Sequence, residues 1–291
     1  MPDNGLELSN LFESYASNYS ILTNGDAMLE QPTLTFGEYT LVYNMLSFAI
    51  AAMIFSGLFF VLARDRVAPK YRISLVVSTL VVGIAAYHYL RIFNSWEAAY
   101  MLSDAGNYIA SGKPFNDAYR YIDWLLTVPL LVVELVLVIG LAKSKQSSML
   151  TKLVIASFLM ILLGYPGELL MDDSVFSMRG LWGLLSTIPF IYIVYVLWVE
   201  LGSAMADQSG KVQVLFRNIR LLLLETWGFY PIVYMAPFFG WTGAESEIAI
   251  QVGYSVADVL AKAGYGVMIY AIARAKSEDE GYEVGQSPVS A

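Results

Sequence analysis

A single lysine, Lys262, stands in a long apolar stretch of the chain, and Asp258 precedes it by four residues. An ammonium group is costly in apolar surroundings, so ionisable residues inside membrane segments usually mark functional sites. The amine of a lysine in a dry pocket can lose its proton and condense with an aldehyde as a Schiff base. Four residues span about 6 Å along a helix, so the Asp258 carboxylate shares a face with Lys262 and can balance its charge. The alternative is a plain buried ion pair that holds helices together.

A stripe of polar residues runs along an earlier apolar segment and consists of Arg120, Asp123, Thr127 and Glu134. Their offsets of three, four and seven residues keep all four on one helix face. Asp123 and Glu134 are then about 16 Å apart along the helix axis, too far for a direct proton transfer. A relay between them needs a carrier midway. Lys262 is the natural carrier, because its segment can lie opposite Asp123 in a bundle.

The two carboxylates of this stripe have different sequence surroundings. Asp123 lies one turn from Arg120, whose positive charge favours an ionised carboxylate. Glu134 lies among leucines and valines without a neighbouring cation, and desolvation favours its protonated form. The pattern predicts a proton acceptor at Asp123 and a proton donor at Glu134. A packing role for Glu134, and a bond from Thr127 to its own backbone, are the simpler alternatives.

Aromatic residues are candidates for the wall of an elongated apolar ligand site around Lys262. They are Trp124, Trp227 and Tyr230, and packing in the protein core is the alternative for each. The only histidine, His88, lies toward the outer end of its apolar segment, at a depth where it can bond to Asp123.

The elements that must position these residues are membrane helices. The chain has 291 residues, of which 57% are hydrophobic, and its mean hydropathy is +0.57, values that indicate a membrane protein. Each apolar segment has about the 20 residues that a helix needs to cross the hydrocarbon layer. The segments are Tyr39–Leu62, Ile73–Phe93, Tyr119–Leu141, Leu150–Met171, Leu181–Leu201, Val214–Phe239 and Ile248–Ile272. The predicted fold is an all-α bundle of seven transmembrane helices in one unit.

The distribution of basic residues predicts the orientation of this bundle. Lysines and arginines gather after the first, third and fifth segments, whereas the intervening connections are acidic or poor in them. The basic positions are Arg64, Arg66, Lys70, Arg72, Lys143, Lys145, Lys152, Lys211, Arg217 and Arg220, and the acidic ones Asp172, Asp173, Glu245 and Glu247. By the positive-inside rule, the N-terminus lies outside and the C-terminus in the cytoplasm.

We therefore expect an extracellular N-terminal segment (1–37), a seven-helix domain (38–275) and a cytoplasmic tail (276–291) that is acidic and disordered from Ser277. The connection from Trp96 to Asp117 contains turn residues and predicts a short hairpin on the outer face. Pro231 predicts a kink in the sixth helix, which suits either an opening bundle or static packing.

Composition also excludes several classes of function. The net charge is −8 and the basic residues form no block outside the cytoplasmic loops, which argues against a nucleic-acid partner. The chain has no cysteine, which excludes disulfides, thiol chemistry and thiolate metal sites. The first 37 residues lack the pattern of a cleavable signal peptide, so the first span is expected to direct insertion.

Several motifs resemble those of the microbial (type 1) rhodopsins, over the range from about Gln31 to Gly281. The strings that resemble the third, sixth and seventh helices of light-driven proton pumps are RYIDWLLTVPLLVVELVLV, TWGFYP and YSVADVLAKAGYG. The strings VAPKYR, YHY, LGYPGE and RGLWG resemble the xanthorhodopsin branch, which is related to the proteorhodopsins. Agreement of independent motifs in order and spacing makes the resemblance specific.

The resemblance implies a cofactor and roles for the central residues. Lys262 would bear all-trans retinal as a protonated Schiff base. Asp123 would be its counterion and first proton acceptor, Asp258 the second counterion, and Glu134 the cytoplasmic proton donor. Further implied positions are His88 bonded to the acceptor, Arg120 on the outer side, Tyr89 and Tyr230 beside Asp258, and Trp124 and Trp227 around the polyene.

Three further comparisons with the family refine what the resemblance implies. Asp123, Thr127 and Glu134 match the triplet of proton pumps rather than that of sodium or chloride pumps. Leu131 occupies the position where leucine accompanies absorption of green light. Gly183 replaces a bulky tryptophan and would open a window for a carotenoid antenna, although close helix packing also selects glycine. The acidic residues at the outer ends of the sixth and seventh helices match no proton-release pair.

These observations predict a light-driven outward proton pump in a bacterial inner membrane, with lipid, protons and a carotenoid as partners and a homotrimer or homopentamer as assembly. The first alternative is a photosensory rhodopsin that signals through a partner protein, which has no need of a fast donor at Glu134. The second is a seven-helix transporter or receptor without photochemistry, in which Lys262 and Asp258 form an ion pair.

Overall fold

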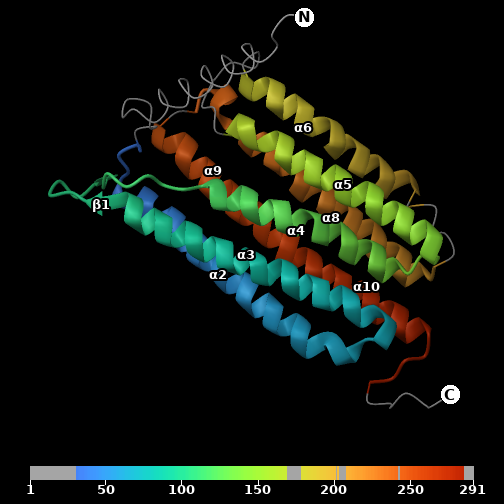
Figure 1. Ribbon diagram of the computed structural model, residues 1–291. Helices are drawn as coiled ribbons and strands as arrows, with labels where there is room; N and C mark the ends of the chain where they lie inside the picture. The colour runs from blue at the N-terminus through green and yellow to red at the C-terminus, as the bar shows by residue number, and fades with distance from the viewer. Residues whose placement is uncertain (1–30, 169–177, 201, 203–207, 242, 285–291) are drawn as a thin grey trace, which may run out of the picture.

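The computed structural model describes residues 31–168, 178–200, 202, 208–241 and 243–284. Within these residues the chain forms a bundle of seven membrane-spanning helical segments (Figure 1). The first five are α2 (Phe36–Ala63), α3 (Arg72–Ala99), α4 (Ala118–Ile139), α5 (Lys143–Glu168) and α6 (Met178–Tyr195) with the π-helical turn η3 (Val196–Glu200). The last two are α8 (Gly210–Tyr234) and a continuous segment of α9 (Gly243–Asp258), the π-helical turn η5 (Val259–Gly264) and α10 (Tyr265–Asp279). The prediction of an all-α, seven-helix membrane bundle is confirmed.

The helices follow one another around the bundle. Each consecutive pair from α2 to α6 packs together, α9 returns to α2, and α8 packs against both α9 and α10 (Figure 1). Short 3-10 turns shape the connections: η1 (Arg64–Arg66), η2 (Pro69–Tyr71) and η4 (Ala236–Phe239). This order places α3, α4 and α10 next to one another, so that side chains from all three meet inside the bundle.

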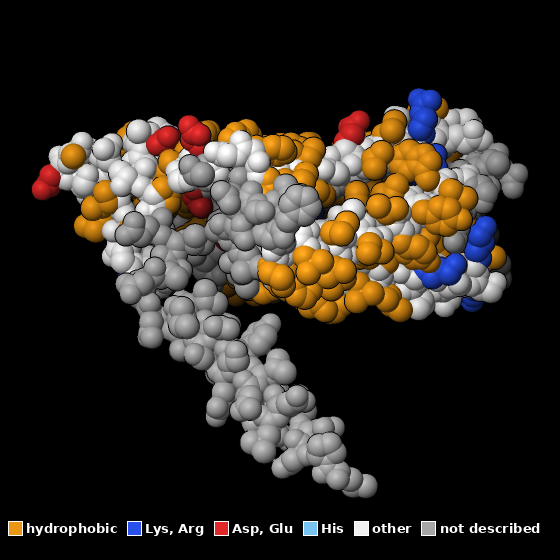
Figure 2. Space-filling model, turned by 90° about the horizontal axis from the view of Figure 1, so that it is seen from above, with side chains coloured by type: hydrophobic (Ala, Val, Ile, Leu, Met, Phe, Trp, Pro, Cys, Tyr) orange, Lys and Arg blue, Asp and Glu red, His pale blue; other side chains and the backbone are white. Residues whose placement is uncertain are grey.

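Apolar side chains cover the outside of the bundle as well as its core. Among the described residues, six helical segments are long and apolar enough to cross a membrane. The remaining one, α8, falls short because it carries Lys211, Arg217, Arg220 and Glu225. Figure 2 shows hydrophobic side chains over the middle of one face, most of its acidic groups toward one end, and Lys and Arg near the other. The basic end is the one that holds the C-terminus (Figure 1).

A hairpin joins α3 to α4, as the turn residues predict. Strands β1 (Tyr100–Leu102) and β2 (Tyr108–Ala110) pair antiparallel, and Leu34 adds a further bridge to Tyr108. Beneath it, Trp96 stacks on Tyr39, whose ring also stacks on that of Tyr108. These aromatic contacts attach the hairpin to the start of α2 and the end of α3.

The last helix is longer than expected. It ends at Asp279 instead of before Ser277, and the Ser277 hydroxyl is buried and accepts a hydrogen bond from the backbone N–H of Ala68 at 2.8 Å. The expectation of a disordered tail from Ser277 is therefore wrong for its first residues, because polar partners on other elements hold them. The remainder of the tail from residue 285, the N-terminal segment up to residue 30, and the acidic loop with Asp172 and Asp173 lie outside the described residues.

Candidate functional site

The π-helical turn η5 carries Lys262 into the centre of the bundle, where its side chain is 1% exposed. Its Nζ atom lies 2.8 Å from Asp123 Oδ2 on α4 and is hydrogen-bonded to Asp258 Oδ1 at the end of α9. Both carboxylates are as deeply buried as the lysine. Two acids thus flank one amine in dry surroundings. This arrangement can balance a cation at the amine and can take a proton from it.

Asp258 accepts more hydrogen bonds than Asp123 does. It accepts hydrogen bonds from the hydroxyls of Tyr89 at 2.7 Å and Tyr230 at 2.5 Å, and from Trp124 Nε1 at 3.0 Å. Tyr89 and Tyr230 therefore lie beside Asp258 as expected, and the indole bond of Trp124 is an additional contact. Three donors from α3, α4 and α8 hold this carboxylate in its ionised form.

Asp123 has fewer partners than expected. His88 faces it, but the closest distance, from Nδ1 to Oδ1, is 3.9 Å, and this nitrogen instead bonds to the Ile84 carbonyl at 3.0 Å. The expected hydrogen bond between His88 and Asp123 is not formed. Thr127 donates to the Asp123 backbone carbonyl at 2.8 Å, which is the local bond that threonine commonly makes in a helix.

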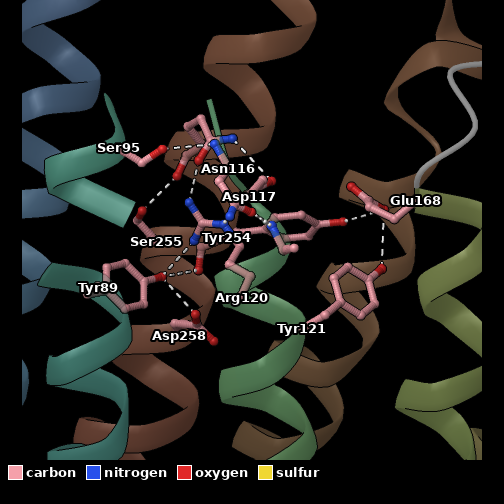
Figure 3. A network of polar contacts seen from close by, with 12 residues as sticks. Tyr89, Ser95, Asn116, Asp117, Arg120, Tyr121, Glu168, Tyr254, Ser255 and Asp258 are labelled. Atoms are coloured by element: carbon pink, nitrogen blue, oxygen red, sulfur yellow. Dashed lines mark hydrogen bonds and ion pairs between the residues drawn. The ribbon is translucent and has the colours of Figure 1, made fainter. Parts of the chain in front are cut away.

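Arg120 lies in a polar network with Asp117 and Tyr89 (Figure 3). It donates to Asp117 Oδ1 and Tyr89 Oη, at 2.8 and 3.0 Å, and to Gln251 Oε1. The expectation that Arg120 stabilises the ionised form of Asp123 by direct proximity is wrong. The ion partner of Asp123 is Lys262, because partners on other helices draw the guanidinium away.

Sequence reasoning missed a second buried pair near this network. Arg179 of α6 lies 3.5 Å from Glu168 at the end of α5. The Tyr121 hydroxyl donates to Glu168 at 3.2 Å (Figure 3). Glu168 stands in the string LGYPGE, but its partner is on another helix and no spacing in the sequence indicates it.

Glu134 is fully buried on the opposite side of Lys262 from Arg120. The Ser78 hydroxyl of α3 donates to its Oε2 atom at 2.5 Å, and its Oε1 atom has no hydrogen-bond partner in the described part of the chain. Among the described residues, no ion pair involves Glu134. Ser78 was not anticipated, because it lies on another helix.

An apolar pocket opens from Lys262 toward α5, α6 and α8. The three aromatic residues predicted for its wall, Trp124, Trp227 and Tyr230, line it, and so do Leu131 and Gly183. Tyr89, predicted beside Asp258, does not line it. Its other lining residues are Tyr121, Val128, Met160, Ile161, Gly164, Ser186, Thr187, Phe190, Pro231, Tyr234, Tyr254 and Ala261. An apolar, aromatic pocket that ends at a lysine amine fits a hydrophobic aldehyde.

Gly183 lies at the side of this pocket, against the ring of Tyr234. A Cβ atom at this position would stand 3.0 Å from Tyr234 Cε1, too close for normal contact. Glycine therefore permits the close approach of α6 to Tyr234. This contact agrees with the packing explanation, and it also leaves the pocket without a bulky wall at this point.

The fold and this centre define a seven-helix membrane protein with a buried lysine between two acids. Residues 40–276 match the family of bacteriorhodopsin-like proteins, to which the chain belongs. It is 32% identical over 232 residues to the green-light absorbing proteorhodopsin of Gamma-proteobacterium EBAC31A08, covering 79% of this chain and 85% of that protein. The chain is thus a microbial rhodopsin, a transporter family rather than an enzyme family.

Solved structures agree. The structure of xanthorhodopsin, described as a light-driven ion pump with dual chromophore, is 60% identical with a TM-score of 0.83. The match covers 87% of this chain and 100% of the xanthorhodopsin chain. A thermophilic rhodopsin is 55% identical, with a TM-score of 0.82 and the same coverage.

Proposed function

We propose that the protein is a light-driven outward proton pump that carries all-trans retinal on Lys262. The observation that carries this proposal is the placement of two acids of opposite character on α4. Asp123 contacts the lysine amine, whereas Glu134, fully buried, bonds only to Ser78 among the described residues. The similarity to proteorhodopsin and xanthorhodopsin supports it.

The residues of the pocket fit retinal. Trp124, Trp227 and Leu131 would hold the apolar chain, and Lys262 would hold its aldehyde end. When bound, retinal would supply absorption of light and a change of shape that alters the surroundings of the Lys262 nitrogen. The protein's part is to place groups of suitable proton affinity on either side of this nitrogen.

The hydrogen bonds support Asp123, rather than Asp258, as the acid that takes the proton. Asp258 accepts from two phenols and an indole, which stabilise its negative charge. Asp123 has only the lysine within ion-pair distance, with His88 at 3.9 Å. Asp123 is therefore the acceptor, and Asp258 stays ionised as the second counterion.

Glu134 lies toward the end of the bundle that carries most basic residues and the C-terminus. By the positive-inside rule this end faces the cytoplasm. A proton given up by Glu134 then replaces the one that Asp123 accepted on the outer side, so the net movement is outward. We also propose a bacterial inner membrane as the location and a homotrimer or homopentamer as the assembly.

The direct test is the pH outside cells that express the protein with all-trans retinal. Illumination should acidify the medium, and a protonophore should abolish the change. A coloured protein that leaves the pH unchanged would contradict pumping and support the photosensory alternative. Absence of colour after addition of retinal would contradict retinal binding itself.

Glu134→Gln is expected to slow the return of a proton to the Lys262 nitrogen by roughly 10²-fold, since a positioned acid typically contributes at least this much. Flash spectroscopy measures this rate directly. Glu225→Gln, on an exposed position of α8, is the matched control and should leave it unchanged. An unaltered rate in the Glu134 variant would contradict the donor role.

We further propose that the open wall at Gly183 accepts a carotenoid antenna. Gly183→Trp is expected to abolish the carotenoid band from the action spectrum of pumping while the retinal band persists, because an indole would put a bulky wall at this side of the pocket, where Tyr234 would have to shift. The measurement compares action spectra of cells with and without an added carotenoid. Gly83→Trp, at an exposed glycine of α3 with nothing within 4 Å, is the control. An unmodified protein without a carotenoid band would contradict the antenna.

A further inference from the structure

The carboxyl end of α10 folds over the end of the bundle nearest Glu134. Glu280 caps this helix and accepts a hydrogen bond from the Tyr71 hydroxyl at 2.6 Å. The same Glu280 oxygen lies 2.8 Å from Lys70 Nζ. Glu280 lies just beyond residues 40–276, the range that matches the family.

Tyr71, the last residue of η2, also begins a line of buried hydroxyl-bearing residues that continues on α3. Ser74 and Ser78 follow at offsets of three and four residues, which places all three on one helix face. The Ser74 hydroxyl donates to the Tyr71 carbonyl at 2.6 Å, and that of Ser78 lies 3.1 Å from the Ser74 carbonyl and 2.5 Å from Glu134. Tyr71, Ser74 and Ser78 are each at most 3% exposed.

These hydroxyls are unusual in their setting. The described part of α3 near them is otherwise built mainly of valine, leucine and isoleucine, which offer water no partner. Oxygens one turn apart can bond to water that enters the interior, and such water needs two to four polar partners. The line leads from the surface carboxylate of Glu280 to the fully buried carboxylate of Glu134.

The charges that face Glu280 keep its surroundings balanced. Lys70 and Tyr71 face it from η2, and Lys276 and Asp279 from its own helix. Lys276 is buried, bonds to the Ile139 carbonyl at the end of α4 at 2.5 Å, and lies 5.2 Å from the centre of the Tyr71 ring. Two cations and two carboxylates cancel, so the entrance has no net charge that would repel a proton. Lys276 also fixes Tyr71 between α10 and α4.

We propose that Glu280 is the surface group through which protons enter to refill Glu134, with Tyr71, Ser74 and Ser78 lining the route. Glu280 takes a proton from bulk water and gives it to water along this line, and the Glu134 carboxylate becomes a carboxylic acid. One proton enters, one is delivered, and Glu280 returns to its ionised form. This role rests on the proposed function of the protein as a proton pump. Glu280 acts on the pumping cycle only through Glu134, as a positioning residue for proton uptake.

The test follows the reprotonation of Glu134 in the full-length protein, loaded with retinal and placed in lipid vesicles. Time-resolved infrared spectroscopy measures the return of the Glu134 carboxylic acid band, assigned by its loss in Glu134→Gln. In Glu280→Gln we expect this return to slow by about tenfold at neutral pH, less than groups in direct contact contribute, and to slow further as the pH rises. Addition of azide, whose protonated form is a small weak acid, should restore the rate. Azide would not restore the rate if the defect were purely structural.

Glu278→Gln is the matched control. Glu278 and Glu280 lie two residues apart, and their side chains are 40% and 38% exposed. Glu278 pairs with Lys211 and Arg274 and has no recorded contact with Tyr71 among the described residues. Its variant should keep the pH profile of the unmodified protein. Tyr71→Phe, which retains the ring and loses the hydroxyl, should reproduce part of the slowing.

Two results would contradict the proposal that protons enter through Glu280. One is an unchanged pH profile in Glu280→Gln while the unmodified protein pumps. The other is a slowing that is equal at every pH and insensitive to azide. Failure of the proposed function looks different: the unmodified protein would then show neither light-driven acidification nor a Glu134 band that disappears and returns.

Discussion

Lys262→Ala is expected to produce a colourless protein that leaves the external pH unchanged in light. Lys262 is the only lysine that lines the pocket in the part of the chain that the structure describes, so retinal would lose its point of attachment. The substitution also leaves Asp123 and Asp258 buried without their common cation. Removal of one partner from a buried ion pair typically costs about 3–5 kcal/mol. We therefore expect a lower unfolding temperature together with the loss of the visible absorption band.

Absorption spectra of the purified variant with added retinal measure the first effect, and thermal unfolding measures the second. Lys276→Ala is the control for colour, because this lysine is also buried but bonds to the Ile139 carbonyl away from the pocket. A pigment of normal absorption in Lys262→Ala would show that retinal is attached elsewhere. It would overturn the assignment of the central site.

Asp123→Asn is expected to abolish pumping while the protein still folds and binds retinal. The site holds two carboxylates and one cation, so loss of the Asp123 charge leaves Lys262 balanced by Asp258. The amide cannot accept the proton, and Asp258 is held ionised by its three hydrogen bonds. Proton transfer in light should fall by at least roughly 10²-fold, the usual effect of losing a positioned base.

External pH recording and flash spectroscopy test this expectation. Asp123→Glu keeps the carboxylate and should retain part of the activity, and Asp104→Asn in the exposed turn of the hairpin should retain all of it. Undiminished acidification in Asp123→Asn would mean that Asp258 accepts the proton. The assignment of acceptor and second counterion would then have to be exchanged.

These expectations share one physical origin. The bundle removes Lys262, Asp123 and Asp258 from water where they meet, and Glu134 at a separate depth. Buried charges are tolerated where partners balance them, as Asp123 and Asp258 balance Lys262, and an acid without a cation is stable when protonated. Desolvation acts on both acids of α4. It therefore makes Asp123, which has a cation beside it, a proton acceptor, and Glu134, which has none, a proton donor.

The sequence by itself determined the features that depend on one helix at a time. Apolar segments of membrane length predicted the seven spans, including α8, whose charged residues lower its hydropathy. Helical periodicity correctly paired Asp258 with Lys262 and predicted that Asp123 and Glu134 share a face. These predictions hold because backbone bonding within a helix fixes which side chains lie together.

Only the tertiary structure decided which residues meet between helices. The rotation of each helix sets whether Arg120 turns toward Asp123 or toward Gln251, and whether His88 reaches Asp123 or its own backbone. The bond from Ser78 to Glu134 joins residues 56 positions apart, and that from Tyr71 to Glu280 joins residues 209 apart. Neither spacing is visible in a linear pattern, because it depends on how packed helices are placed against each other.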